Sequence, residues 1–316
     1  MRTCDTLYIV VPCYNEEEAL AKTSQTLLSK LTDLVSAGRI APESRVLFVD
    51  DGSKDGTWRF ITALRDVTPY AAGLKLSRNR GHQNALLAGL LTAKDSADMT
   101  ISIDADLQDD ISVIDGFVDK YYEGFDVVYG VRSDRKTDSA FKRATARGYY
   151  RLLRRMGVEI VSDHADCRLL SKRALEGLAQ FKEVNLFLRG LVPLIGYPSA
   201  EVCYERRERV AGESKYSVKK MVALAWQGIT SMSVKPIRLI ISLGVTLFLL
   251  ALACIIAFAI LLGCGHAEWM FSLIIAVVCA ACGLNLIAIG VIGEYVGKIY
   301  LEVKARPRFL IEDYFN

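Results

Sequence analysis

Two long uncharged runs near the C-terminal end, Leu239–Gly265 and Trp269–Gly293, most constrain how this chain can fold. At about 1.5 Å of rise per residue, a helix over the first run would be roughly 40 Å long, enough to cross a hydrocarbon core of about 30 Å. The second run is nearly as long. We therefore predict a two-helix transmembrane hairpin, with buried core helices as the alternative that helical length alone leaves open.

The flanking charges predict the orientation of this hairpin. Basic residues precede the first run and follow the second: Lys215, Lys219, Lys220, Lys235 and Arg238, then Lys298, Lys304, Arg306 and Arg308. The connecting segment, residues 264–268, has neither Lys nor Arg. The positive-inside rule then places both ends of the chain in the cytoplasm. The apolar run Leu7–Val11 stops at Pro12 and is too short for a signal peptide, so we expect a cytoplasmic catalytic part in a multi-pass protein of the cell (inner) membrane.

Two further patterns concern the membrane region. Apolar residues at helical spacing, from Val218 to Ile229, predict an amphipathic helix on the bilayer surface, although a core-facing helix would show the same period. Small residues in the second run, from Ala280 to Gly293, would let its backbone approach the first run closely.

The preceding part of the chain alternates short β-branched runs with helical patterns. Strands are expected at Leu7–Val11, Val46–Val49, Gly73–Leu76, Met99–Ile103 and Asp126–Tyr129. Helices are expected at Glu16–Leu34, with Asn15 as its N-cap, and at Thr57–Asp66, Gln83–Ala93, Ile111–Glu123 and Ala140–Met156. This alternation predicts an α/β sheet with helices on both faces, in which ligands bind beyond the carboxyl ends of the strands.

Polar residues gather at four of those strand ends. The segments are Pro12-Cys-Tyr-Asn-Glu16, Asp50-Asp-Gly-Ser-Lys-Asp-Gly-Thr57, Arg78-Asn-Arg-Gly-His-Gln-Asn84 and Asp104-Ala-Asp-Leu-Gln-Asp-Asp110. Glycine-rich phosphate loops of the two common kinds are absent from the sequence. Carboxylates repel a pyrophosphate unless a divalent cation lies between them. We therefore predict an Mg²⁺ or Mn²⁺ site formed by Asp104 and Asp106, with a carbonyl oxygen of Gln108 as a further ligand.

The remaining polar residues leave alternatives open. Asp50 and Asp51 are expected to accept hydrogen bonds from a ribose or a base. Asp55 and Thr57 either contribute to the site or only start a helix. His82 is either a general base or a structural hydrogen-bonding residue of its loop.

Together the segments resemble family 2 glycosyltransferases of the GT-A fold, specifically the polyprenyl-phosphate glycosyltransferase branch. That branch includes dolichol-phosphate mannose synthases and bacterial undecaprenyl-phosphate glucosyltransferases. Besides the four strand-end segments, the resemblance rests on Asp166-Cys-Arg168, Gly212-Glu-Ser-Lys-Tyr216, Gly293-Glu-Tyr-Val-Gly-Lys298 and Ala305-Arg-Pro-Arg308. It implies a Rossmann-like mixed sheet in a catalytic domain over residues 1–210. A juxtamembrane segment over 211–236, transmembrane helices over 237–297 and a cytoplasmic tail over 298–316 complete the expected organisation.

The resemblance also implies residue roles. Catalytic residues would be Asp104, Asp106, Arg132 and, if a general base exists, Asp166, for which pairing with Arg168 or another basic residue is the alternative. Donor-binding residues would be Pro12, Tyr14, Asn15, Glu16, Asp50, Asp51, Arg78, Asn79, Gly81, His82, Asp104 and Ala105. Acceptor-phosphate residues would be Arg132, Lys142, Arg143, Arg206, Arg209 and Lys215. A serine that the family often has four residues after the basic position is replaced here by Ala146, and the Arg206–Lys215 group either clamps the acceptor phosphate or contacts lipid headgroups.

The expected function is inverting transfer of a sugar from a nucleotide sugar to polyprenyl (undecaprenyl) phosphate, for cell-envelope glycan modification. UDP-glucose or UDP-N-acetylglucosamine is the expected donor, and a homo-oligomer, by resemblance a tetramer, the expected assembly. A processive polysaccharide synthase would need a Q-x-x-R-W motif, which is absent, and more spans. An inactive membrane scaffold would not need the intact carboxylates. The net charge of +3 gives no reason to expect a nucleic-acid partner.

Overall fold

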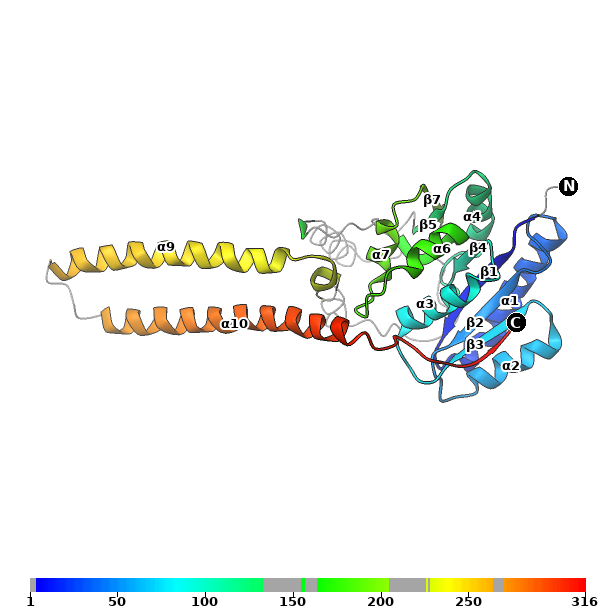
Figure 1. Ribbon diagram of the computed structural model, residues 1–316, viewed down its shortest axis with the longest axis horizontal. Coiled ribbons are helices and arrows are strands. Elements are labelled where there is room, and N and C mark those ends of the chain that lie inside the picture. The colour runs from blue at the N-terminus through cyan, green and yellow to red at the C-terminus, as the bar shows by residue number, and fades with distance from the viewer. Residues whose placement is uncertain (1–3, 133–154, 157–163, 205–225, 227, 264–269) are drawn as a thin grey trace.

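The computed structural model describes residues 4–132, 155–156, 164–204, 226, 228–263 and 270–316 (Figure 1). Eight strands form one mixed sheet in the order β7-β5-β6-β4-β1-β2-β3-β8. Their bounds are β1 Leu7–Cys13, β2 Arg45–Asp50, β3 Ala71–Leu76, β4 Met99–Ser102, β5 Val127–Arg132, β6 His164–Ser171, β7 Ser199–Tyr204 and β8 Ile311–Phe315. The five strands expected from the sequence are all present, with ends that differ by at most three residues.

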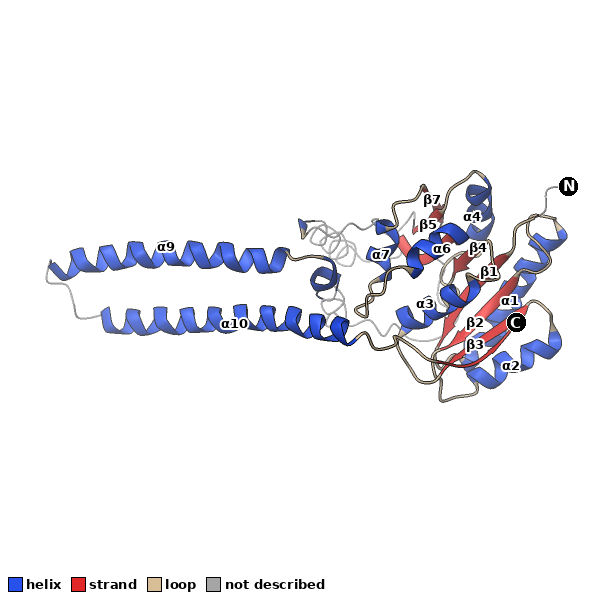
Figure 2. Cartoon of the chain, in the orientation of Figure 1, coloured by secondary structure: helices blue, strands red, loops and turns tan. Residues whose placement is uncertain are grey.

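Helices cover both faces of this sheet (Figure 2). They are α1 Glu17–Ser36, α2 Thr57–Val67, α3 His82–Ala93, α4 Val113–Tyr122, α6 Lys172–Ala179 and α7 Leu188–Leu194. Because successive side chains of a strand point to opposite faces, β1 contributes Ile9 to a core with α1, α2 and α4, and Val10 to a second core with α3, α6 and α7. The predicted α/β sheet with helices on both faces is therefore confirmed. The expected helix Ala140–Met156 lies almost wholly outside the described residues.

Close packing fixes helix α3 on the sheet. A Cβ added at Gly89 would lie 2.4 Å from Val10 Cγ1 and 2.6 Å from Val49 Cγ2, so only a glycine fits there. The helix axis is held against β1 and β2 at this point. The N-terminal residue of α3, His82, is thereby placed near the carboxyl ends of the same two strands.

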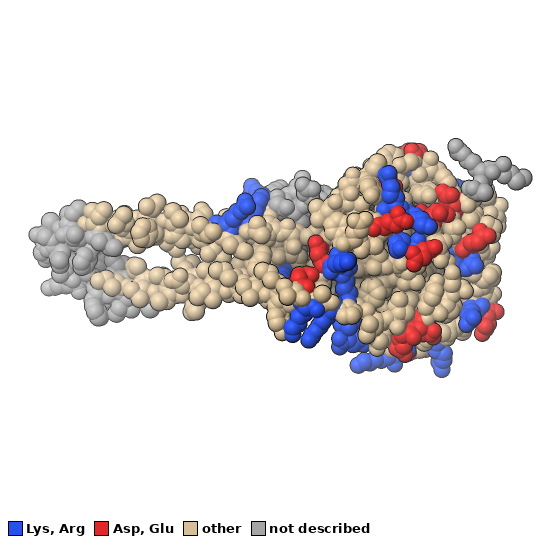
Figure 3. All heavy atoms as spheres, viewed as in Figure 1, with Lys and Arg blue, Asp and Glu red and all other residues tan. Residues whose placement is uncertain are grey.

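Two further helices, α9 Lys235–Gly263 and α10 Met270–Lys304, extend away from the sheet (Figure 1). Both are long and apolar enough to cross a membrane by length and composition, and the described side chains in the candidate spans are not buried. Charged side chains gather over the α/β domain and the base of the hairpin, and the hairpin beyond is almost uncharged (Figure 3). Most of the expected juxtamembrane segment, 211–236, lies outside the described residues.

One expectation about this hairpin is wrong. A Cβ added at Gly283, Gly290 or Gly293 would meet no described atom within 4 Å. These small residues therefore do not pack against α9, and open space lies over them instead. At these three glycines the small-residue surface does not face the neighbouring helix of the same chain.

The tail after α10 returns to the sheet. Strand β8 pairs antiparallel with β3, with Gly73 opposite Phe315 and Leu74 opposite Tyr314. Tyr8 Oη and Asn316 Oδ1 form a hydrogen bond of 2.9 Å between opposite ends of the chain. The residues beyond the second apolar helix thus form an edge strand of the α/β domain, which the sequence did not predict.

Candidate active site

The strand directions bring the polar loops to one edge of the sheet. Strand β1 runs parallel to β2 and to β4, and β2 runs parallel to β3. The four loops that follow these strands therefore lie at the same edge, as predicted. Strand β6 is antiparallel to both β4 and β5, so its first residues and the last residue of β5, Arg132, reach this edge too. Asp166, near the start of β6, joins the site in this way.

Hydrogen bonds tie the loop after β1 to the loop after β2. Asn15 donates its backbone N–H to Ser53 Oγ at 2.9 Å, and its Oδ1 accepts the N–H of Lys54 at 2.9 Å. The expected N-cap role of Asn15 is wrong. Helix α1 begins one residue later, after Glu16, and the side chain of Glu16 makes no capping hydrogen bond. Asn15 instead has a φ of 52°, a left-handed conformation that asparagine tolerates, and bridges two loops.

Asp55 and Thr57 take the structural alternative. Asp55 Oδ1 accepts the N–H of Thr57 at 3.1 Å and its hydroxyl at 2.6 Å, and Asp55 Oδ2 accepts the N–H of Glu17 at 3.3 Å. Thr57 Oγ1 in turn accepts the N–H of Glu16 at 3.0 Å. The two side chains therefore hold the starts of α1 and α2 together. These bonds also hold the pKa of Asp55 below its usual value.

The adjacent carboxylates Asp50 and Asp51 have different surroundings. Asp51 is buried and saturated, because Oδ1 accepts the N–H of Arg80 at 2.7 Å and Oδ2 that of Gly81 at 2.9 Å. Asp50 is fully buried, and its Oδ1 accepts the N–H of Ser53 at 3.2 Å. Asp50 Oδ2 is buried with no hydrogen-bonding partner among the described residues. Burial raises the pKa of both carboxyls, and Asp50 alone has an acceptor left for a ligand.

Two glycines make the loops after β2 and β3 possible. Gly52 has a φ of 67°, and a Cβ there would lie 2.5 Å from the carbonyl carbon of Arg78. Gly81 has a φ of 85° and directly precedes α3. The predicted residues Arg78 and Asn79 are exposed on this loop, and Asn79 Oδ1 accepts the N–H of Gly81 at 3.1 Å. Pro12 is buried at the end of β1, and Tyr14 is exposed beyond it.

The turn after β4 carries the two carboxylates predicted to bind a metal. Leu107 adopts a φ of 50°, and the N–H of Gln108 donates to Asp106 Oδ1 at 3.2 Å. Ala105 is held from the opposite side, because Thr23 Oγ1 donates to its carbonyl oxygen at 2.7 Å. Asp104 and Asp106 are both partly exposed, whereas Gln108 is buried. The described residues contain no group of three or more His, Cys, Asp and Glu that could hold a metal by themselves.

This donor set still fits a divalent cation. Mg²⁺ is commonly held by one or two protein carboxylates, and substrate phosphates supply further oxygens. Asp104 and Asp106 offer two hard oxygen ligands on one fixed turn. His82 also reaches this turn, with 2.9 Å between its Nε2 and Asp104 Oδ1. Partial burial acts to lower the pKa of His82, but the hydrogen bond to Asp104 and the charges of Asp104 and Asp166 raise it to about 9.

An ion triad lies beside this turn and includes a residue that the sequence reading missed. Arg189, on α7, donates Nε to Asp166 Oδ1 at 2.9 Å and Nη2 to Asp166 Oδ2 at 2.8 Å. Arg168, which is buried, donates Nη2 to Asp166 Oδ1 at 3.0 Å. Burial acts to raise the pKa of Asp166, but the two guanidinium groups lower it well below its usual value. Of the two alternatives for Asp166, the structure has the ion pair. The only sequence signal for Arg189 was an arginine on a short apolar helix.

Most of the predicted acceptor-phosphate residues cannot be placed. Lys142, Arg143, Arg206, Arg209 and Lys215 all lie outside the described residues. The backbone of Arg132 ends β5 and is in register with Tyr204 of β7. The predicted acceptor side of the site thus stays a prediction.

Comparisons with known proteins identify the family. The model of glycosyl transferase family 2 matches residues 8–178. The chain is 54% identical over 313 residues to the uncharacterized glycosyltransferase YkoT of Bacillus subtilis, covering 98% of this chain and 92% of that protein. It is 38% identical over 319 residues to the SfII prophage-derived bactoprenol glucosyl transferase of Shigella flexneri, covering 96% of each.

Among solved structures, a mannosyltransferase of Pyrobaculum calidifontis in complex with GDP-Man and Mn²⁺ matches with a TM-score of 0.49 at 18% identity, covering 75% of this chain and 65% of that one. The family match spans more than half of the chain, and full-length relatives agree with it. The chain belongs to family 2 of the glycosyltransferases.

Proposed function

We propose that this glycosyltransferase transfers glucose, with inversion, from a nucleotide sugar to a polyprenyl phosphate at the cytoplasmic face of the cell membrane. The acceptor and the sugar are suggested by the Shigella relative, which is named a bactoprenol glucosyl transferase. UDP-glucose is the donor that this name and the sequence analysis favour together, with UDP-N-acetylglucosamine as the alternative.

The observation that carries the proposal is the edge of the sheet shared by Asp50, Asp104 and Asp106. A buried carboxylate with an unused acceptor suits a base N–H or a ribose hydroxyl of the donor. The carboxylates of Asp104 and Asp106, which follow β4, suit a divalent cation that lies between the protein and the pyrophosphate. The nucleoside and the diphosphate of one donor would then lie across neighbouring strand ends.

In the proposed reaction, a phosphate oxygen of the acceptor attacks the anomeric carbon, and the bond from that carbon to the nucleoside diphosphate breaks. A divalent cation held by Asp104 and Asp106 would neutralise charge on the departing diphosphate. A phosphomonoester is largely a dianion at neutral pH, since its second pKa is about 6, and is therefore already a nucleophile. Asp166, paired with Arg168 and Arg189, then orients the site and does not accept a proton.

The apolar helices suggest how the enzyme meets a lipid acceptor. We infer that α9 and α10 cross the membrane and that the catalytic domain, residues 1–210, lies in the cytoplasm, as the flanking basic residues indicate. The hairpin then holds the active site within reach of the headgroup region. A homo-oligomer remains a prediction from resemblance.

The test is transfer into lipid. Membranes containing the protein are incubated with polyprenyl phosphate and labelled UDP-glucose, UDP-N-acetylglucosamine or GDP-mannose, and lipid is then extracted. We expect label from UDP-glucose in a lipid-linked monosaccharide, and none with the Asp104→Asn variant. Label recovered in a polymer, or in no lipid with any donor, would contradict the proposal.

A further inference from the structure

The end of helix α10 that lies nearest the α/β domain carries three bonded polar side chains, of which Tyr295 and Lys298 contact the segment that precedes α9 and Glu302 contacts the α/β domain. Tyr295 Oη donates to the carbonyl oxygen of Ser233 at 2.5 Å. Lys298 Nζ donates to Thr230 Oγ1 at 2.5 Å and to Ser231 Oγ at 3.0 Å. Glu302 reaches furthest into the catalytic domain. We call the row Tyr295–Lys298–Glu302 the junction; Glu302 is its contact with the catalytic domain, and Figure 1 shows this end of α10 beside that domain.

Glu302 accepts three hydrogen bonds from two consecutive residues. Its Oε2 accepts the N–H of Val184 at 2.8 Å, and its Oε1 accepts the N–H of Asn185 at 2.8 Å and Nδ2 of Asn185 at 2.7 Å. Bonds to an ionised acceptor are about twice as strong as neutral ones. The turn at Val184 and Asn185 therefore depends on a carboxylate that comes from the hairpin and lies more than a hundred residues away in the sequence.

The segment after this turn leads directly into the active site. Leu186, Phe187 and Leu188 are buried, with exposures of 4%, 1% and 2%. The N–H of Leu188 donates to Gln83 Oε1, on α3, at 2.9 Å, and the next residue is Arg189 of the ion triad. A packed segment of this kind transmits a displacement at Asn185 to Arg189, because it has no loose residues that could absorb it.

From these contacts we propose that Glu302 is a positioning residue, which acts through the 184–189 segment to hold Arg189 against Asp166. The junction and the active site are then rigidly connected through the 184–189 segment. The inference rests on the proposed function, because only a lipid acceptor gives the enzyme a reason to fix its active site relative to the hairpin. Glu302 touches no reacting group and acts only through Arg189.

The experiment compares Glu302→Ala, Glu302→Gln and Asn185→Ala in the full-length protein in detergent or liposomes. Amide hydrogen exchange of the peptide spanning 184–190 is measured alongside steady-state transfer. Glu302→Ala should raise the exchange rate of this peptide and lower kcat by about tenfold, the loss expected for a charge-assisted contact, while KM for the donor stays within about twofold. Glu302→Gln keeps one acceptor oxygen and should restore part of kcat.

Asn185→Ala guards against a variant that simply fails to fold, because it removes only one of the three bonds to Glu302, together with a longer bond of 3.4 Å to the carbonyl oxygen of Lys298. It should lower kcat by about threefold, and adding it to Glu302→Ala should cause no further loss, as two mutations in one contact are not additive. The matched control is Glu312→Gln, on β8, which removes an exposed carboxylate paired with Lys75 of β3 and should leave both readouts unchanged.

The outcomes separate this inference from the proposed function. Unchanged exchange in Glu302→Ala, or faster exchange with wild-type kcat, would overturn the positioning role. A wild-type protein that forms no lipid-linked sugar would refute the proposed function. In that case the exchange rates of the 184–190 peptide would still support or contradict the proposed coupling of Glu302 to Arg189.

Discussion

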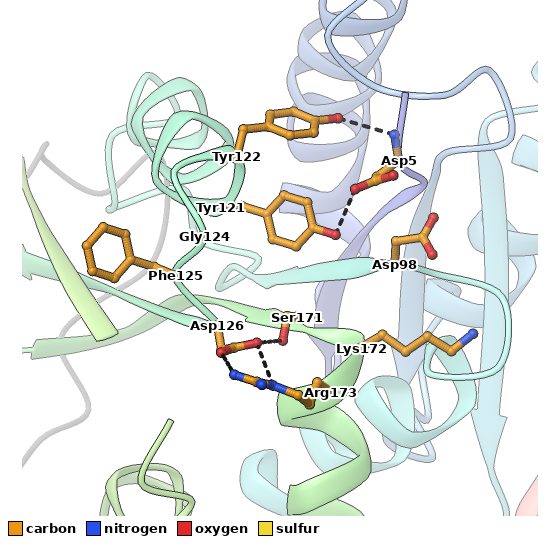
Figure 4. A pocket seen from close by; sticks show the side chains of 10 residues that line it. All are labelled: Asp5, Asp98, Tyr121, Tyr122, Gly124, Phe125, Asp126, Ser171, Lys172 and Arg173. Atoms are coloured by element: carbon orange, nitrogen blue, oxygen red, sulfur yellow. Dashed lines mark hydrogen bonds and ion pairs between the residues drawn. The ribbon is translucent and has the colours of Figure 1, made fainter. Parts of the chain in front are cut away.

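The two edges of the central sheet both carry clusters of charged residues, but they differ in how these residues are bonded. At the amino ends of β1, β4 and β5 lies a cavity of about 380 Å³ (Figure 4). Several of its polar groups are hydrogen-bonded within the domain. Tyr121 Oη donates to Asp5 Oδ2 at 2.8 Å, Ser171 Oγ donates to Asp126 Oδ1 at 2.7 Å, and Asp98 Oδ2 accepts the N–H of Thr6 at 2.9 Å.

The carboxyl edge has bonds left unmade and a strained backbone. Asp50 Oδ2 has no partner within the described part of the chain, and Asn15 and Leu107 adopt positive φ angles. Unsatisfied buried groups and sparsely populated backbone conformations cost free energy, and they persist where binding or catalysis needs them. The difference favours the carboxyl edge as the candidate active site, because three of the four buried side-chain atoms without a partner among the described residues, those of Asp50, Arg80 and Asn84, lie there and only that of Arg45 lies at the amino edge.

The largest expected effect distinguishes the two edges most directly. Asp104→Asn and Asp106→Asn should each lower transfer by about 100- to 1,000-fold, the loss typical of removing one electrostatic contact to developing charge. Both proteins should stay folded and membrane-bound. Initial rates with labelled donor measure this, and EDTA should abolish activity that Mg²⁺ or Mn²⁺ restores.

Asp95→Asn, at an exposed site paired with Lys94, is the control for loss of one carboxylate and should transfer at the wild-type rate. Full activity of Asp104→Asn in the presence of chelator would mean that the carboxyl edge of the sheet has no more part in catalysis than the amino edge.

The second expected effect concerns the ion triad at the carboxyl edge. Arg189→Met leaves the charge of Asp166 only partly compensated beside anionic substrates, and kcat/KM should fall by about 10- to 100-fold. Arg189→Lys keeps a charge but loses the bidentate geometry, so it should recover part of the activity. Wild-type kinetics in Arg189→Met would show that the triad serves the fold alone.

Acid stability gives a second measurement on the same variant. The folded-state pKa of Asp166 is lowered, so its ion pairs stabilise the protein fully above the unfolded pKa of about 4 and are lost as the pH falls below it. Between about pH 5 and pH 3, the thermal midpoint of the wild type should therefore fall more than that of Arg189→Met, in which the pKa of Asp166 is closer to its unfolded value. Parallel curves would mean that Arg189 does not hold the carboxylate.

The sequence predicted the sheet and the convergence of the polar loops at one of its edges, because both depend on local patterns. Short β-branched runs ended in polar segments, and parallel strands bring such ends together. The bonding of individual residues was not predictable. Whether Asp50 or Asp51 is saturated depends on two amides from the loop after β3, and Arg189 meets Asp166 only because α7 packs on the same face as α3. Strand β8 was missed for the same reason, since its partner β3 lies more than two hundred residues earlier.

The third expected effect distinguishes the roles of two adjacent carboxylates, Asp50 and Asp51. Asp50→Asn removes a buried charge that the fold does not satisfy, so the thermal midpoint should hold or rise, while KM for the donor rises by about tenfold. Asp51→Asn loses one of two backbone acceptors and should cost about 1–3 kcal/mol of stability, with a smaller change in donor KM. Thermal unfolding and donor titrations measure both. A reversed pattern would assign donor recognition to Asp51.

The smallest expected effect tests the amino edge itself. Tyr121→Phe removes the hydroxyl that donates to Asp5 and keeps the ring, so it should lower stability by about 1 kcal/mol, the usual net value of one hydrogen bond. The thermal midpoint should fall by a few degrees at most, roughly 2–4 °C for a domain of this size. The kcat and the KM values for donor and acceptor should not change, because the cavity lies at the edge of the sheet opposite the loops that carry Asp50 and Asp104. A change in KM for either substrate would mean that the cavity communicates with the candidate active site.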